Sequence, residues 1–222
     1  AVPRRLAERA MDSVRARLID RQNRLLLLLA PAFDKSDQDP GYIKGYPPGI
    51  RENGGQYTHA AVWALMAVAK GGNGDEAVEL FHMLNPINHT RTLDAVAKYR
   101  TEPYVLDGDV YARPPHAGRG GWSWYTGSAG WLYRAGLEHL LGLRGRGDTF
   151  TVSPCVPSSW TSFSITWKHR GGTYLIEVSN PDRVWTGVLK AEIDGKSVDH
   201  RAIPKVNDTG THVVKITMGR RM

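Results

Sequence analysis

The sequence has a single cysteine, Cys155, and no long apolar run. A lone thiol excludes an internal disulfide framework and a zinc site built on cysteines, so we expect a buried free thiol. The run of five leucines at residues 25–29 is far shorter than the ~20 residues that a membrane-spanning helix needs. We therefore expect neither a signal peptide nor a transmembrane helix in these residues.

Motifs for metal or nucleophilic chemistry are also lacking. The histidines show no H-x-x-x-H or H-E-x-x-H spacing, so we expect no metal site, and we expect no cofactor. There is no P-loop, and Ser128 does not fit the nucleophile-elbow pattern. Asp107 and Asp109 would face opposite ways on an extended chain, which makes them a poor catalytic pair.

Positive charge is in excess, with 29 Lys and Arg against 22 Asp and Glu and a net charge of +7. Such an excess can indicate nucleic acid, membrane lipid or an anionic substrate as partner. Here it is spread thinly, and acidic residues interrupt even the arginine-rich residues 4–24. We expect mostly solvated surface, some attraction for anions, and no nucleic-acid partner.

The most distinctive segment is residues 41–59, which is rich in Gly, Pro and aromatic residues and also carries many polar side chains. A long irregular segment within a compact domain is commonly a functional loop. The apolar residues 60–69 predict a buried helix, so Thr58 and His59 would lie at its N-terminus, where an anion is favoured. From the residues alone, a phosphate site and a structural loop capped by Thr58 are equally supported.

A second Gly-rich loop, residues 114–127, leads into a helix expected at residues 128–141, with Thr126 and Gly127 at its start. Aromatic rings in these loops could stack on sugar faces, and polar side chains could hold hydroxyl groups. Aromatic residues more often form a core, so composition alone does not establish a sugar site. The candidates are Tyr46, Trp122, Trp124 and Tyr125 for stacking and Glu52, Asn53 and Gln56 for hydroxyl groups.

The hydrophobic period changes along the chain. Helical spacing is found from Pro3 to about Asn23, in residues 75–84 and in residues 128–141, and residues 92–97 suggest a further short helix. Beyond about residue 142 the period becomes two, and Asp194-Gly195 is a strong hairpin signal. We expect helices followed by a small antiparallel β module, a sandwich.

Four collinear segments carry a resemblance to a known family: residues 40–64 (PGYIKGYPPGIRENGGQYTHAAVWA), 80–89 (LFHMLNPINH), 102–144 and 154–160 (PCVPSSW). They resemble the C-terminal part of glycoside hydrolase family 94, most closely that of cyclic β-1,2-glucan synthases and β-1,2-oligoglucan phosphorylases. The resemblance implies a mainly α fold with a β tail. Residues 1–142 would be the C-terminal helices of an (α/α)6 barrel, and residues 143–222 a β-sandwich module.

The family resemblance also implies inverting phosphorolysis, in which phosphate attacks the anomeric carbon and an Asp protonates the leaving oxygen. By resemblance, His59 and the pair Thr126 and Gly127 bind phosphate, and Glu52 contacts the sugar. The expected substrates are a β-glucan oligosaccharide and phosphate or a sugar 1-phosphate. The remaining substrate-binding candidates are Arg51, Asn53, Gln56, Tyr46, Trp124 and Tyr125.

The sequence departs from the family in one respect. The general acid of the family lies upstream in an Asp-Trp-Asn-Asp-Gly-like motif, which these residues lack. Because the chain also begins with Ala1 rather than Met, we expect an inactive fragment of a glycosyltransferase or glycoside phosphorylase, completed by an upstream part of the same polypeptide. We expect a location in the cytoplasm or on the cytoplasmic face of the bacterial inner membrane.

Several alternatives stay open. The chain could be a non-catalytic β-glucan-binding module that controls chain length, or a truncated reading frame without a stable fold. The sequence does not separate a synthase from a free phosphorylase, nor a monomer from a homodimer.

Overall fold

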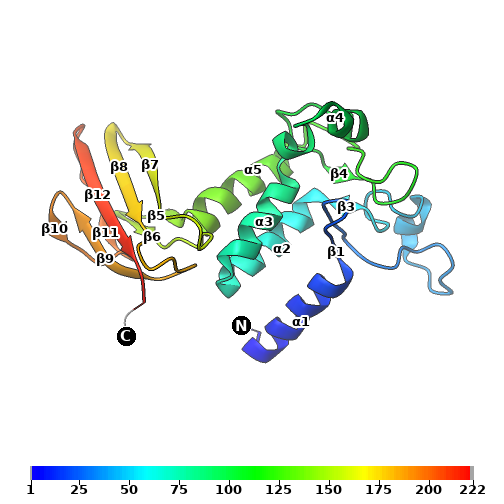
Figure 1. Cartoon of the computed structure of the whole chain (residues 1–222), viewed down its shortest axis with the longest axis horizontal. Helices are drawn as coiled ribbons and strands as arrows, with labels where there is room; N and C mark the ends of the chain where they lie inside the picture. Colours follow the sequence, from blue (N-terminus) through cyan, green and yellow to red (C-terminus); the bar gives the residue numbers. More distant parts are fainter. Residues whose placement is uncertain (1, 221–222) are drawn as a thin grey trace. The chain divides into compact units, whose positions relative to one another are not determined.

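The computed structural model describes residues 2–220. Within this range the chain forms five α-helices and twelve strands, with short 3-10 and π-helical segments between them (Figure 1). It divides into two compact units. The first unit comprises the residues up to 65 and residues 80–133, and the second comprises residues 66–79 and 134 onward.

The first unit opens with helix α1, Arg4–Arg17, none of whose residues is buried. The helix expected to reach Asn23 therefore ends earlier, because residues 19–26 form an antiparallel pair of β1, Ile19–Asp20, with β2, Leu25–Leu26. Leu25 and Leu26 are buried, and Leu25 packs with Tyr99 and Val110 in the core of this unit. Part of the leucine run is thus a short buried strand.

Three further helices follow: α2, Thr58–Gly71, α3, Gly74–Leu84, and α4, Leu93–Tyr99. The start of α2 at Thr58 agrees with the apolar run that predicts it. Thr92 caps α4 by accepting a hydrogen bond from the Ala95 N–H at 3.2 Å. Two 3-10 turns, η1, Gly41–Gly45, and η2, Pro86–His89, lie in the connections.

The helix expected at residues 128–141 has two parts. Helix α5, Thr126–Arg134, begins two residues earlier than expected and continues as a π-helix, η3, over Ala135–Leu140. Wider π-helical turns are rare and occur frequently near functional sites. The period of 3.6 in the sequence does not reveal this change of winding.

The second unit is built on two sheets. A three-stranded sheet has the order β11–β6–β5, and a five-stranded sheet has the order β10–β9–β12–β8–β7. Side chains from both sheets share one core around Phe150, Tyr174, Ile176 and Ile216. The strands are β5, Leu143–Arg146, β6, Thr149–Val152, β7, Ser162–His169, β8, Gly172–Ser179, β9, Val188–Ile193, β10, Lys196–Ser197, β11, Ile203–Pro204, and β12, Thr211–Met218.

The expectation of a wholly antiparallel module is wrong. Strand β12 lies between β9 and β8, antiparallel to β9 but parallel to β8, with Thr211 opposite Thr173 and Thr217 opposite Ser179. Alternation of apolar and polar residues follows from one buried sheet face, whatever the direction of the neighbouring strand. The sequence pattern therefore shows the strands but not this parallel pair.

The expectation of a mainly α fold containing part of an (α/α)6 barrel is also wrong. The described residues contain twelve strands alongside five helices, and they show no portion of such a barrel. Between α4 and α5, residues 100–125 are irregular except for the short strand β4, Asp109–Val110. Glycine and proline are frequent in that segment, which prevents the continuous helices that a barrel needs. In the range that the structure covers, no helix has the length and apolarity to cross a membrane.

Candidate functional site

The two Gly-rich loops lie on either side of residues 107–111, which we call the central segment. Strand β3, Gln56–Tyr57, pairs antiparallel with β4 in this segment, and Val110 also forms a bridge with Gly120. The Thr58 N–H donates to the Gly108 carbonyl at 3.0 Å, and the Gly121 N–H donates to the Asp109 carbonyl at 2.9 Å. The backbone thus brings both loops to one place in the first unit.

Two glycines of the second loop allow a close approach to the central segment. A Cβ atom at Gly120 would lie 1.9 Å from Asp107 Oδ2, and one at Gly121 would lie 2.5 Å from Asp109 Oδ1. Gly108 similarly leaves room for the Tyr125 ring, at 2.9 Å from a Cβ placed there. Glycine at these positions lets backbone and buried carboxylates meet without a clash.

Buried polar atoms without a hydrogen-bond partner concentrate in this region. Among the residues described, seven buried side-chain nitrogen or oxygen atoms lack a partner, and all but His169 Nε2 lie in the first unit. Each such atom costs roughly 1–3 kcal/mol, so native proteins keep few of them. Their concentration indicates a site that a polar ligand would complete. The six atoms are Arg51 Nε, Glu52 Oε2, His59 Nε2, Asp107 Oδ1, Asp109 Oδ2 and Ser128 Oγ.

His59 lies in the first turn of α2, between two tryptophan rings. Its ring centroid is 4.8 Å from that of Trp63, at an interplanar angle of 76°, and 5.6 Å from that of Trp131. Because Trp131 lies in the second turn of α5, these contacts bring the beginnings of α2 and α5 close together. The two rings hold the imidazole in place, while its Nε2 atom has no hydrogen-bond partner among residues 2–220.

Thr126 and Gly127 are the first residues of α5, and both are exposed. Apart from its chain neighbours and the backbone of its own helix, no described residue would have an atom within 4 Å of a Cβ at Gly127, so there is space for a ligand beside it. The first N–H groups of a helix have no partner within the helix and favour an anion. Ser128, the next residue, is only 1% exposed.

Arg51 is sandwiched by aromatic rings. Its guanidinium carbon lies 4.6 Å from the Trp122 ring centroid and 5.6 Å from that of Tyr46, and its Nε lies 3.7 Å from Glu52 Oε2. Burial opposes the charge of Arg51, but the Tyr125 side chain, Asp109 and Glu52 outweigh it and hold the pKa of Arg51 above its usual value. Arg51 therefore presents a fixed positive charge beside Glu52.

The two aspartates of the central segment have raised pKa values. Burial raises the pKa of Asp107 to about 6, although the Thr101 hydroxyl donates to Oδ2 at 2.9 Å. Burial also raises the pKa of Asp109, against the opposing effects of the Trp122 N–H at 3.1 Å and of Arg51. Sequence reasoning set both residues aside because alternate residues on an extended chain diverge. Gly120 and Gly121, which let the second loop approach these carboxylates, could have indicated that both aspartates are buried, but a local spacing rule does not consider them.

Asn53 and Gln56 are engaged in holding the first loop. Asn53 is fully buried, donates to the carbonyls of Phe33 at 3.0 Å and Tyr46 at 2.8 Å, and accepts from the Phe33 N–H at 2.7 Å. Gln56 accepts from the Leu26 N–H at 3.0 Å and donates to the Thr58 hydroxyl at 3.4 Å. The expected role of Asn53 and Gln56 in sugar binding stays a prediction. Hydrogen bonds from either side chain to a sugar would compete with the bonds it makes within the protein.

The rings of the second loop differ in accessibility. Trp124 is 64% exposed, and its indole N–H donates to Glu102 Oε1 at 3.2 Å. Trp122 is also exposed and stacks with Arg51, whereas Tyr125 is half-buried against Gly108. Two wide aromatic faces are thus accessible on this loop.

Comparison with known proteins identifies the family. The model of the glycosyl hydrolase 94 superfamily, catalytic domain, matches residues 2–142. Over 79% of its length the chain is 50% identical to the cyclic β-(1,2)-glucan synthase NdvB of Rhizobium meliloti (strain 1021), and it covers 6% of that protein. Over 90% of its length it is 38% identical to the N,N'-diacetylchitobiose phosphorylase of Vibrio furnissii, of which it covers 24%.

A third relative is the solabiose phosphorylase of Paenibacillus borealis, 32% identical over 86% of the chain. The chain spans 25% of that relative, so it corresponds to a quarter or less of each of these three proteins. The relatives thus include both glycoside phosphorylases and a glucan synthase. The chain belongs to the glycosyl hydrolase 94 superfamily, and its residues 2–142 are part of the family's catalytic domain.

Proposed function

We propose that the chain forms part of a glycoside phosphorylase-type enzyme that acts on β-1,2-glucans, and that it supplies contacts to phosphate and to sugar. The observation that carries this proposal is the concentration of unpartnered buried polar atoms where the two loops meet. The β-1,2 linkage is supported by the 50% identity to a cyclic β-(1,2)-glucan synthase. Phosphate as a substrate is supported by the phosphorylases among the relatives.

The phosphate would lie between the first turns of α2 and α5. In the part of the chain that the structure describes, His59 Nε2 has no hydrogen-bond partner, and the backbone at Thr126 and Gly127 offers N–H donors. Hydrogen bonds to an oxyanion are stronger than those between neutral groups, and the N-termini of both helices favour negative charge.

The sugar would lie against Glu52 and the aromatic rings. Glu52 Oε2 pairs with the Arg51 charge at 3.7 Å but accepts no hydrogen bond from the described residues, so it could accept one from a sugar hydroxyl, and Arg51 could donate one. Trp124, Tyr125 and Tyr46 would provide ring faces. This set combines the few directed polar groups and the apolar surface that ligand sites commonly have.

In the proposed reaction, a phosphate oxygen attacks the anomeric carbon as the glycosidic bond breaks, with inversion. The leaving oxygen takes a proton from a general acid, and the nucleophile needs no protein base because it is already an anion. The 222 residues contain no Asp-Trp-Asn-Asp-Gly-like motif. We therefore propose that the acid comes from the upstream part of the same polypeptide, in the cytoplasm or at the cytoplasmic face of the inner membrane.

A second candidate is a glucan-binding module without catalysis, which the exposed faces of Trp122 and Trp124 favour. Assays of sugar 1-phosphate formation from β-1,2-glucan and phosphate separate the two functions. The full-length protein is expected to form this product, and the 222-residue chain alone is expected not to form it. Product formation by the chain alone would refute the missing-acid proposal. Glucan-induced thermal stabilisation without any product from the full-length protein would favour the binding module.

A further inference from the structure

The second unit contains a cavity of about 350 Å³ that the proposed phosphorolysis does not use. All its lining residues belong to this one unit. They come from several segments: the end of α2, the π-helix, strand β5, and the loops around residues 154, 187 and 200. The volume lies within the range of ~300–1,000 Å³ that is typical of small-molecule sites.

The charged lining of this cavity is entirely basic. Lys70, His139, Arg144 and His200 line it, and among the described residues no Asp or Glu does so. Two acidic residues lie nearby. Glu138 is paired with Arg134 Nε at 2.9 Å, and Asp199 lies 3.5 Å from His200 Nδ1.

Arg144 is held in place by neutral groups. Its Nε donates to the Glu138 backbone carbonyl at 2.8 Å, and its Nη2 lies 3.3 Å from His139 Nδ1. In the part of the chain that the structure covers, neither Arg144 nor Lys70 has a carboxylate within ion-pair distance. A concave surface with uncompensated positive charge concentrates anions.

The pKa of His139 depends on the positive charges in and around this cavity. Burial and the charges of Arg144, Arg134 and Lys70 lower its pKa, although Glu138 opposes them. With Nδ1 facing the Arg144 guanidinium, the proton of the neutral ring lies on Nε2. An anion in the cavity would offset the repulsion between these cations and a protonated His139 ring, and it could accept a hydrogen bond from that ring.

We propose that this cavity binds a phosphate group, carried either by inorganic phosphate or by a phosphorylated monosaccharide, with Arg144 and Lys70 as its charge partners. A planar guanidinium and an ammonium together are well suited to a phosphate group. The hydroxyl groups of Ser153 and Thr186 in the lining can serve its oxygens or those of an attached sugar. The site uses none of the residues proposed for phosphorolysis, so either proposal can fail without the other.

Histidine NMR titration tests this site. Inorganic phosphate or a hexose 1-phosphate is expected to raise the pKa of His139, whereas the neutral hexose is not. Arg144→Gln and Lys70→Gln should each weaken binding about tenfold, the change expected for the loss of ~1.4 kcal/mol. Arg146→Gln, an exposed arginine on the same strand that does not line the cavity, is the matched control and should bind normally.

His59→Ala separates this site from the phosphorolysis site. The proposal predicts that His139 still responds to both phosphates in that variant. Tighter binding of the hexose 1-phosphate would identify the phosphorylated sugar as the ligand, and equal binding would identify the phosphate group alone. A His139 pKa that does not change, or that changes equally in wild type, Arg144→Gln and Lys70→Gln, would overturn the proposal. Loss of the response only in His59→Ala would overturn it as well.

Discussion

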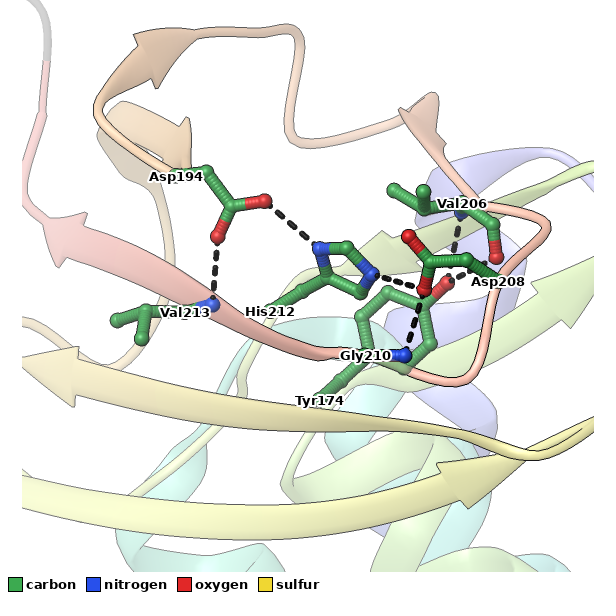
Figure 2. A network of polar contacts seen from close by, with 7 residues as sticks. All are labelled: Tyr174, Asp194, Val206, Asp208, Gly210, His212 and Val213. Atoms are coloured by element: carbon green, nitrogen blue, oxygen red, sulfur yellow. Dashed lines mark hydrogen bonds and ion pairs between the residues drawn. The ribbon is translucent and has the colours of Figure 1, made fainter.

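His212 and Asp194 form an ion pair with 2.7 Å between Nδ1 and Oδ2, and the other ring nitrogen of His212 lies 2.9 Å from Asp208 Oδ1 (Figure 2). The His212 side chain is only 10% exposed. Because both nitrogens face carboxylate oxygens, these contacts stabilise the doubly protonated imidazolium form of the ring. Asp194 lies in the turn before β10, and Asp208 lies in the loop before β12. His212, within β12, therefore links both of these segments to its strand.

This arrangement predicts how the stability of the second unit depends on pH. The hydrogen bonds that the His212 ring donates to Asp194 and Asp208 raise the pKa of His212 above its unfolded value. Its contribution to stability is therefore complete below about pH 6.5 and is lost as the pH rises through the folded pKa. The pKa values of both aspartates are lowered, chiefly by the bond to His212, so their contribution is lost only in acid. Urea unfolding should therefore show greater stability at pH 6 than at pH 8.5.

The matched variant for this prediction is His212→Gln, which cannot carry the charge. Its free energy of unfolding should change less between the two pH values than that of the wild type. An equal pH dependence in both proteins would contradict the assigned imidazolium.

Gly120→Ala tests the close approach at the central segment. The added methyl group would lie 1.9 Å from Asp107 Oδ2, so a buried carboxylate must move. We expect a loss of roughly 1–3 kcal/mol in the free energy of unfolding, as for other overpacked sites. Gly130→Ala, within α5 and with open space around its Cβ, is the control and should stabilise by about 0.5–1 kcal/mol. Equal stability of the two variants would contradict the contact.

Arg51→Lys tests the stacking of the guanidinium on Trp122. Lysine keeps the charge but loses the planar group. In the full-length protein the KM for glucan should rise about two- to fivefold, the effect of losing ~0.5–1 kcal/mol of cation–π stabilisation. Arg113→Lys, an exposed arginine, is the control. Unchanged glucan kinetics in both variants would remove Arg51 from the sugar site.

Asn53→Ala tests whether the Asn53 side chain stabilises the first loop or binds the sugar. The variant loses three hydrogen bonds to the backbone of Phe33 and Tyr46, so we expect a loss of roughly 1–3 kcal/mol in the free energy of unfolding. Glu52→Gln should keep this stability and instead raise the KM for glucan. If Asn53→Ala is fully stable but binds glucan poorly, Asn53 acts on the ligand rather than on the loop.

Local patterns predicted part of the fold. The apolar run after His59 identifies α2, and Thr92 marks the start of α4. The period of two after residue 142 identifies the main strands of the second unit. The parallel pairing of β12 with β8 could not be predicted, because alternation carries no strand direction. The barrel was inferred from family resemblance, not from periodicity, and residues 100–125 do not form the helices it requires.

The candidate site was predicted to a similar extent. Glycine, proline and aromatic residues identified both loops, and the structure places them against one central segment. The burial of Asp107 behind Gly120 joins the central segment to the second loop, which is beyond the reach of spacing rules for neighbouring residues. Asn53 stood out by its polarity alone, and only the contacts show that it holds the loop.

The central claim is that His59 binds phosphate rather than sugar. It is tested most directly by measuring KM for phosphate and for β-1,2-glucan separately in the full-length protein carrying His59→Ala. His116→Ala, an exposed histidine in the second loop, is the control. We predict that His59→Ala raises the KM for phosphate about tenfold or more, as expected for a lost charge-assisted hydrogen bond, and leaves the KM for glucan within about twofold. Equal changes in the two KM values, or no change in either, would contradict the claim.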